Sequence, residues 1–387
     1  MRFPGRLPAA ALASLKRHWL LGLYIIVATG VTVQRIVLHK QNVFRIFASA
    51  SRNILAGDNP YAAHPVQYFD FFRYSPAFAI AFTPFAVVPE WLGLAAWNLT
   101  NALALYWAVQ RLLPRPQAQL VLVLVLGDIA RTMQSCQSNG LVTALMIAAF
   151  IAYSGPRLWR GAFAVAAGTA IKIFPLGAAL FALQRRDKWR ALGMVAAAIA
   201  LLALLPAAFI GPHSLLLQYG RWAAQEHAET FKPMSSVMDL LDVWIGYYGP
   251  RFPVQLVGLA ILMVPAIAGE SRDDPAWRLR LLSSLLIFSV LFNYGAERPG
   301  FVIATTGIAI WYVTGPRTTL RSVLILLTLA LVTGDGVGLW PPGIRDWMNE
   351  SRIRVIPVLA SWIAIQWDLL SPRAVPATEP VTVFRSA

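Results

Sequence analysis

Long apolar runs alternate with short polar stretches along this chain. The first run, about Trp19 to Val37, has the roughly 20 apolar residues that a helix needs to cross a membrane. This pattern predicts an all-α polytopic membrane protein with about 10–12 transmembrane helices. Further spans are expected near residues 91–113, 119–132, 141–153, 192–210, 254–269, 280–295, 301–314, 321–334 and 354–371.

Two apolar stretches depart from the regular pattern. Residues 76–88 are short and broken by prolines, which favours a half-span. Residues 161–183 are apolar but contain Lys172 and Pro175 in the middle, and we interpret them as a re-entrant hairpin with Lys172 near its tip. The predicted fold therefore includes broken or re-entrant helices.

Two polar loops are longer than the others, at residues 38–75 and 211–252. Within the first, residues 43–55 alternate aromatic and aliphatic positions with Arg and Ser, which predicts a short amphipathic helix at the membrane surface. In the second, a group of charged residues is typical of a solvated helix face. This group consists of Arg221, Glu226, His227, Glu229 and Lys232.

The composition agrees with a membrane protein and excludes several other classes. The chain is 57% hydrophobic and 13% charged, whereas about a quarter of a soluble domain is charged. Its net charge of +15 comes from short basic clusters between apolar runs, which indicates cytoplasmic loops rather than a nucleic-acid partner. One cysteine and five scattered histidines give no disulfide and no metal pattern, and no nucleotide-binding motif is present. We therefore expect no cofactor and no divalent metal.

The basic clusters also predict an orientation. Residues 1–18 and 372–387 are expected to be cytoplasmic tails that flank a single multi-pass domain over 19–371, with an uncleaved N-terminal anchor. The outward-facing segments would then be 38–75, 134–140, 211–252, 293–300 and 335–353. An alternative makes both broken stretches full spans and moves two basic loops outside.

Two acids in the first outer loop are candidates for chemistry. Asp58 lies in Gly-Asp-Asn-Pro-Tyr, which is also good turn chemistry. Asp70 lies in an aromatic segment three residues before Arg73, so it is either a structural ion pair or a general base beside a phosphate-binding cation.

Four further residues carry polar chemistry in apolar surroundings. Lys172 either snorkels to the interface or binds a phosphate. Gln137 and Asn139 either satisfy freed backbone groups at a turn or bind sugar hydroxyls. Glu297 either pairs locally or adds a second acid to the compartment of the first outer loop.

Several of these features, in this order, resemble glycosyltransferase family 87, the polyprenyl-phosphate-dependent mannosyltransferase-like proteins of the GT-C membrane class. The similar stretches are Leu55 to Tyr61, Arg73-Tyr74-Ser75-Pro76, Phe82-Thr83-Pro84, Gln137 to Gly140 and Gly168 to Pro175. The resemblance covers roughly residues 20–370. It implies an inverting transfer of a sugar from lipid phosphate to an acceptor hydroxyl, with an acid of the first outer loop as the base. The position of that acid in the family falls at or near Asn42 here, and Asn cannot serve as a base.

We therefore predict a multi-pass hexosyltransferase of the inner (plasma) membrane, which acts on a polyprenyl-phosphate-linked sugar and a glycan or lipid acceptor. The predicted catalytic acids are Asp70, Asp58 and Glu297. The predicted substrate-binding residues are Lys172, Arg73, Tyr74, Gln137 and Asn139. Two alternatives stay open: a flippase or transporter of lipid-linked sugars, since broken helices with a central Lys are also transporter features, and a catalytically inactive assembly subunit.

Overall fold

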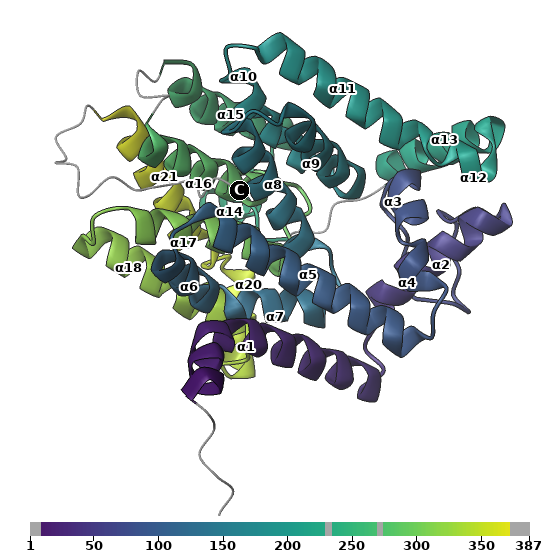
Figure 1. The fold of residues 1–387 in the computed structure, drawn as a ribbon, viewed down its shortest axis with the longest axis horizontal. Helices are drawn as coiled ribbons and strands as arrows, with labels where there is room; N and C mark the ends of the chain where they lie inside the picture. Colours follow the sequence, from purple (N-terminus) through teal and green to yellow (C-terminus); the bar gives the residue numbers. More distant parts are fainter. Residues whose placement is uncertain (1–8, 229–233, 269–273, 372–387) are drawn as a thin grey trace, which may run out of the picture.

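The computed structural model describes residues 9–228, 234–268 and 274–371, and every regular element in these ranges is a helix (Figure 1). The predicted all-α class is therefore confirmed for the described residues. Three helical stretches are long and apolar enough to span a membrane, and a bent pair of helices provides a fourth if it counts as one span. They are His18–Val37, Lys188–Ile210 and Thr319–Gly336, with Pro342–Glu350 and Val355–Leu370 as the bent pair. The fold is thus of the membrane-protein class, while the larger predicted number of spans stays a prediction.

Five helices pack one against the next and form one half of the molecule (Figure 1). In packing order they are α1 (Ala9–Val37), α5 (Glu90–Leu112), α8 (Asn139–Tyr153), α9 (Leu158–Ile171) and α11 (Lys188–Leu204). At the outer edge, α11 buries only Ala191 and Val195, although it is apolar on all sides. A helix with exposed apolar residues all round is suited to contact with lipid.

The other half of the molecule is built around two buried helices that pack against each other. These are α16 (Pro275–Leu291) and α17 (Phe301–Thr314), and most of their residues are buried. Around them lie α18 (Thr319–Thr328) and α21 (Val355–Leu370), and α17 also contacts α8. The contact of α17 with α8 joins the two halves.

The first predicted outer loop, at 38–75, contains the helix α2 (Asn42–Ala56), and the stretch at 76–88 that follows it forms α3 (Pro76–Ala81) and α4 (Thr83–Ala86). The predicted amphipathic helix at 43–55 is thus confirmed, as is the broken character of 76–88. Phe47 of α2 meets Phe78 and Phe82 edge to face at 5.1 and 5.3 Å between ring centroids, a geometry that contributes about 0.5–1.5 kcal/mol per pair. Ser49 and Ser51, on the polar side of the pattern, are nevertheless buried, because α2 packs against α3 and α4.

The helix with the central lysine is interrupted as its proline predicts. The chain leaves α9 at Lys172, which has an extended backbone (φ −143°, ψ 145°), and continues as the 3₁₀ helix η1 (Phe174–Ala179) and α10 (Leu180–Leu183). Pro175 has no N–H to donate to the carbonyl group of Ile171 four residues earlier, so the α-helix cannot continue. The break places the Lys172 side chain at a helix end, where no further turn of α9 covers it.

Several predicted spans are divided into shorter elements. The run at 119–132 forms α6 (Arg115–Leu124) and α7 (Leu126–Gln134), and the run at 321–334 continues from α18 through a π turn, η3 (Leu329–Thr333), into α19 (Gly334–Gly336). The second polar loop is largely helical. The remaining elements are α12 (Ala207–Ile210), α13 (Pro212–Ala228), α14 (Val237–Ile245), α15 (Arg251–Ala268), η2 (Arg298–Gly300) and α20 (Pro342–Glu350).

The two predicted tails can be compared only in part with the structure. α1 already begins at Ala9, so the second half of the predicted 1–18 tail is helical. Residues 1–8 and the tail at 372–387 lie outside the described residues. The cytoplasmic location of both ends therefore stays a prediction.

Candidate functional site

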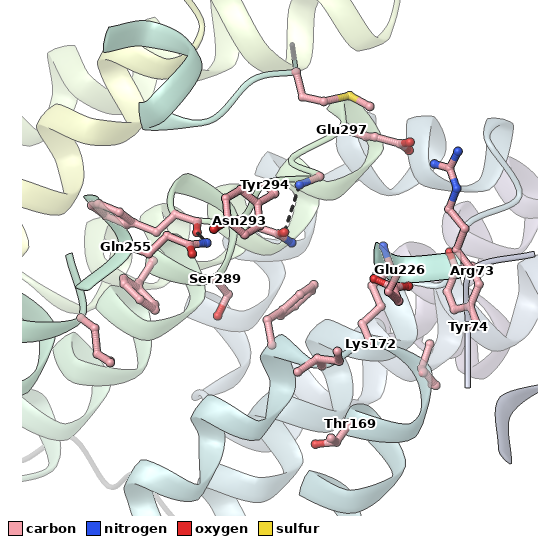
Figure 2. A pocket seen from close by; sticks show the side chains of 18 of the residues that line it. Arg73, Tyr74, Thr169, Lys172, Glu226, Gln255, Ser289, Asn293, Tyr294 and Glu297 are labelled. Atoms are coloured by element: carbon pink, nitrogen blue, oxygen red, sulfur yellow. Dashed lines mark hydrogen bonds between the residues drawn. The ribbon is translucent and has the colours of Figure 1, made fainter. Parts of the chain in front are cut away.

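A cavity of about 700 Å³ lies where the first outer loop meets the broken helix. Its walls come from that loop, from the break after α9, from α13 and α15, and from the end of α16 with the turn that follows (Figure 2). The polar side chains in its lining are Arg73, Tyr74, Gln137, Thr169, Lys172, Trp222, Glu226, Gln255, Ser289, Asn293, Tyr294 and Glu297. Four of the predicted substrate-binding residues and one predicted acid are therefore in the cavity wall. A small adjoining pocket adds the fifth, Asn139.

A continuous chain of hydrogen bonds joins four of the predicted residues. The Lys172 Nζ donates to Asn139 Oδ1 at 2.7 Å, and Asn139 Nδ2 donates to Gln137 Oε1 at 2.8 Å. Gln137 Nε2 in turn donates to the Glu297 carboxylate. Residues 160 positions apart in sequence are thus linked side chain to side chain. The chain of bonds leaves a cation at one end and an acid at the other, and both line the cavity.

The first outer loop is fastened to the end of α9 beside Lys172. Ser75 Oγ donates to the carbonyl oxygen of Ala170 and also accepts from the backbone N–H of Phe78, which caps α3. The Ala170 carbonyl group is available because α9 ends there. This bond holds the preceding residues, Arg73 and Tyr74, against the cavity.

Further hydrogen bonds fix the same loop segment. The Tyr61 hydroxyl donates to the carbonyl oxygen of Tyr74 at 2.9 Å, and Trp222 Nε1 donates to that of Arg73 at 3.4 Å. Burial raises the pKa of the Tyr74 hydroxyl well above its usual range, and the negative charge of Glu297 contributes to the same rise. Tyr74 is therefore a protonated hydrogen-bond donor at neutral pH.

Asp70 lies at the rim and does not line the cavity. Its Oδ1 contacts Arg73 Nη2 at 3.1 Å, in an ion pair whose side chains are 48% and 39% exposed respectively. The same oxygen accepts from the N–H of Phe71, and the backbone φ of Asp70 is +89°, a region that non-glycine residues rarely adopt. Asp70 therefore contacts a residue of the cavity wall, Arg73, without lining the cavity itself, and its predicted catalytic role stays a prediction.

Asp58 is farther from the chemistry. It is exposed in the turn after α2, where the N–H of Tyr61 donates to Asn59 Oδ1 at 3.1 Å. Gln218 Nε2 donates to the backbone oxygen of Asp58, at 3.2 Å. These contacts fit the turn interpretation, and they do not bring its carboxylate into the cavity lining.

Asn42 has partners that account for an amide at this position. Its Nδ2 donates to the carbonyl oxygen of Phe69 at 2.5 Å, and its Oδ1 accepts from the N–H of the same residue at 2.8 Å. A carboxylate cannot make both bonds, because it has no donor. Asn42 thus holds the loop just before Asp70.

The sequence analysis missed most of the cavity wall that comes from the second half of the chain. Glu226 was assigned to a solvated helix face, yet it lines the cavity with Trp222, four positions earlier on the same face of α13. That spacing was the available signal. Asn293 and Tyr294 also contribute, and Asn293 Oδ1 accepts from the N–H of Gly295 at 3.1 Å (Figure 2). Glu229 and Lys232 lie outside the described residues.

Apart from these groups, the cavity wall is apolar. Its apolar side chains are Ala170, Ile171, Ile173, Phe174, Met234, Phe252, Leu256, Leu259, Phe288 and Phe292. Among the described residues, no three His, Cys, Asp or Glu side chains are grouped closely enough to hold a metal ion. The site thus combines cationic and amide side chains, and the Glu297 carboxylate that is hydrogen-bonded to them, with an apolar wall.

The helical fold of the described residues, with helices apolar enough to cross a membrane, is that of a membrane protein. The family comparison then identifies the group. The chain belongs to glycosyltransferase family 87, whose family model matches residues 71–293, more than half of the 387 residues. No curated protein matches the chain. The protein is therefore a membrane glycosyltransferase, as the resemblance implied.

Proposed function

We propose that this glycosyltransferase moves a mannose-like hexose from a polyprenyl-phosphate donor to a lipid or glycan acceptor at the outer face of the inner membrane. The observation that supports this proposal best is the bonded chain from Lys172 to Glu297 in one cavity. It provides a cation for a leaving phosphate and a carboxylate for an acceptor proton, on a common frame.

The donor matches the two kinds of wall in the cavity. Lys172 and Arg73 supply positive charge for the phosphate, since charge-assisted hydrogen bonds are the strong ones in such sites. The apolar wall formed by α15 and α16 suits the adjoining part of a prenyl chain. Tyr74, Gln137 and Asn139 supply hydrogen bonds for sugar hydroxyls.

We assign the base to Glu297, because it lines the cavity and the other two predicted acids do not. In the proposed step, the acceptor oxygen attacks the anomeric carbon, and its proton passes to the Glu297 carboxylate. The bond from that carbon to the phosphate oxygen breaks, and its electron pair leaves with the phosphate. Attack opposite the leaving group inverts the anomeric configuration. Asp70 would orient Arg73 in this scheme, and Asp58 would shape the turn.

The wider arrangement is part of the same proposal. The fold would be GT-C-like, with about 10–12 spans, cytoplasmic termini and the cavity open to the outer side. No cofactor or divalent metal is required by the proposed step, because Lys172 and Arg73 carry the charge that the leaving phosphate develops.

The test is a transfer assay with purified full-length protein and a radiolabelled polyprenyl-phosphate hexose. Glu297→Gln keeps the size of the side chain and a partner for Gln137, but it cannot accept a proton. We expect the variant to lose about 10²- to 10⁴-fold in turnover, the usual contribution of a general base. Glu350→Gln, an exposed acid on α20, is the matched control and should keep full activity.

Two results would contradict the proposal. Near-normal turnover of Glu297→Gln together with loss of activity in Asp70→Asn would move the base to the rim. Movement of labelled lipid across a vesicle membrane without bond cleavage would instead support a flippase.

A further inference from the structure

A second group of positive charges lies outside the cavity, on α7, η2 and α20 and at the start of α21, where α7 contacts both η2 and α19. We call Arg131, Arg298, Arg345 and Arg354 the arginine cluster. Its acidic partner is Asp335, whose carboxylate contacts Arg354 Nη2 at 3.1 Å and Arg298 Nη1 at 3.5 Å. Arg131 lies within electrostatic range of Asp335, Arg298 and Arg345. None of the four arginines lines the cavity.

The charges of this cluster do not balance. The buried carboxylate of Asp335 pairs with Arg354 and Arg298 and lies within electrostatic range of Arg131. The fourth guanidinium group, that of Arg345, lies within electrostatic range of Arg131. Arg354 is occupied further by Asn349 Oδ1 at 2.7 Å. The Nε atoms of Arg131, Arg345 and Arg354 are nevertheless all buried and have no hydrogen-bond partner among the described residues. Buried donors are normally paired, so these three groups require an explanation.

Other nearby acids do not supply the missing charge. Asp128 of α7 accepts a hydrogen bond from Thr333 at 2.7 Å. Asp346 and Glu350 of α20 are exposed, and neither forms an ion pair within the described part of the chain. Like charges held together in a partly buried site repel one another. An anion from outside the protein would remove this repulsion and satisfy the unpaired donors.

We propose that the arginine cluster is a binding site for a phosphate group, separate from the sugar-transfer cavity. Guanidinium forks match the geometry of phosphate oxygens. Arg298 is 39% exposed, and Arg131 and Arg345 are half-buried, so the group can be reached from outside. The phosphate comes either from a membrane lipid headgroup or from free phosphate. Because Arg298 follows Glu297 directly, a bound phosphate would also steady the turn that carries Glu297.

The experiment measures the thermal unfolding midpoint of the full chain in zwitterionic detergent during titration with inorganic phosphate, at constant ionic strength set by chloride. A ligand that binds only the folded state raises the midpoint by an amount that grows with the logarithm of its concentration once that concentration exceeds the dissociation constant. A second arm compares nanodiscs of phosphatidylglycerol with nanodiscs of phosphatidylcholine. A rise in the unfolding midpoint both with inorganic phosphate and with phosphatidylglycerol shows that the phosphate group suffices. A rise only with phosphatidylglycerol identifies the lipid headgroup as the ligand.

The matched variants separate this site from the cavity. Arg131→Gln/Arg345→Gln leaves both ion pairs of Asp335 intact and should weaken the apparent phosphate affinity at least tenfold. Arg186→Gln/Arg190→Gln removes the same charge from exposed positions and should leave the affinity unchanged. Lys172→Met should also keep the response, even if sugar transfer is lost.

Three outcomes would overturn the inference. The first is that the unfolding midpoint of the wild-type protein rises neither with inorganic phosphate nor in phosphatidylglycerol nanodiscs. This result does not depend on the folding of any variant. The second is a response that Lys172→Met abolishes while the double variant of the cluster retains it. The third is a double variant that lowers the midpoint without phosphate and keeps the wild-type response, which shows a purely structural charge network.

Discussion

Arg321 and Lys172 lie near opposite ends of α16, both in largely apolar surroundings. They differ in whether an acidic side chain of the protein balances their charge. At the start of α16, Arg321 is matched by Asp368, lies 4.4 Å from the Trp311 ring centroid and donates to the carbonyl oxygen of that tryptophan. At the other end, Lys172 bonds only a neutral amide, that of Asn139, within the described part of the chain and otherwise faces a cavity. We therefore interpret Arg321, whose charge is balanced by Asp368, as a structural residue. Lys172 has no bonded acid among the described residues, so its charge is available to an anionic ligand.

The largest expected effect is the loss of stability on removal of Arg321, the cation that is paired with an acid. Arg321→Met leaves the Asp368 carboxylate without its cation, and the Trp311 N–H at 2.8 Å is then its main partner. Breaking a largely buried pair by removing one member costs about 3–5 kcal/mol. We expect a corresponding fall in the free energy of unfolding, measured in detergent by denaturant titration. A loss below about 1 kcal/mol would show that the pair resembles an exposed one.

The next effect separates stability from ligand binding. Lys172→Met removes a cation that no bonded acid compensates, so we expect an unfolding midpoint equal to or above that of the wild type. We expect the KM for the lipid-phosphate donor to rise about 10- to 100-fold, as for a lost hydrogen bond to a charged group. Steady-state transfer kinetics and a thermal melt on the same preparation measure both. A destabilised variant with an unchanged KM would show that Lys172, like Arg321, has a structural role.

A smaller effect is expected at the rim. Asp70→Asn keeps the shape of the side chain but removes the charge that holds Arg73. Exposed ion pairs contribute about 0–1 kcal/mol, so the KM for the donor should rise no more than about fivefold, with turnover retained. Asp58→Asn is the control within the same loop and should change neither constant. Complete loss of turnover in Asp70→Asn would make Asp70 the base.

The smallest effect tests the residue at the position of the family's loop acid. Asn42→Asp loses the donor bond to the Phe69 carbonyl oxygen and keeps the acceptor bond to its N–H. We expect a loss of about 1 kcal/mol in stability and no gain in transfer rate, measured in the same assay. A clear rise in rate would show that an acid at this position can still reach the acceptor.

The parts of this fold that follow from local chemistry could be predicted from the sequence. The amphipathic pattern at 43–55 gives α2, and Pro175 gives the break beside Lys172. Turn positions at the ends of apolar runs also brought Gln137, Asn139 and Glu297 into one group. Each of these depends on periodicity, on proline, or on which end of a span a residue occupies.

The rest depends on how elements far apart in sequence pack together, which the hydropathy pattern does not contain. Periodicity places Glu226 on one face of α13 but cannot say that this face looks into a cavity. It likewise offers Asp58, Asp70 and Glu297 as equal candidates, since all three occupy predicted outer segments. The split of 119–132 into α6 and α7 was also hidden, because apolar residues continue across the break at Val125.

The hydrogen bond from Ser75 to Ala170 limits how a substrate can enter the cavity. It ties the outer loop to the broken helix, so the loop cannot lift away to admit a substrate from above without losing that bond and those made by Tyr61 and Trp222. The wall lined by Phe252, Leu256 and Leu259 of α15 is apolar, and within the described part of the chain these side chains form no hydrogen bond to the loop. Under the proposed function, we expect a lipid-linked donor to enter from the bilayer past α15, while the outer loop stays bound to the broken helix.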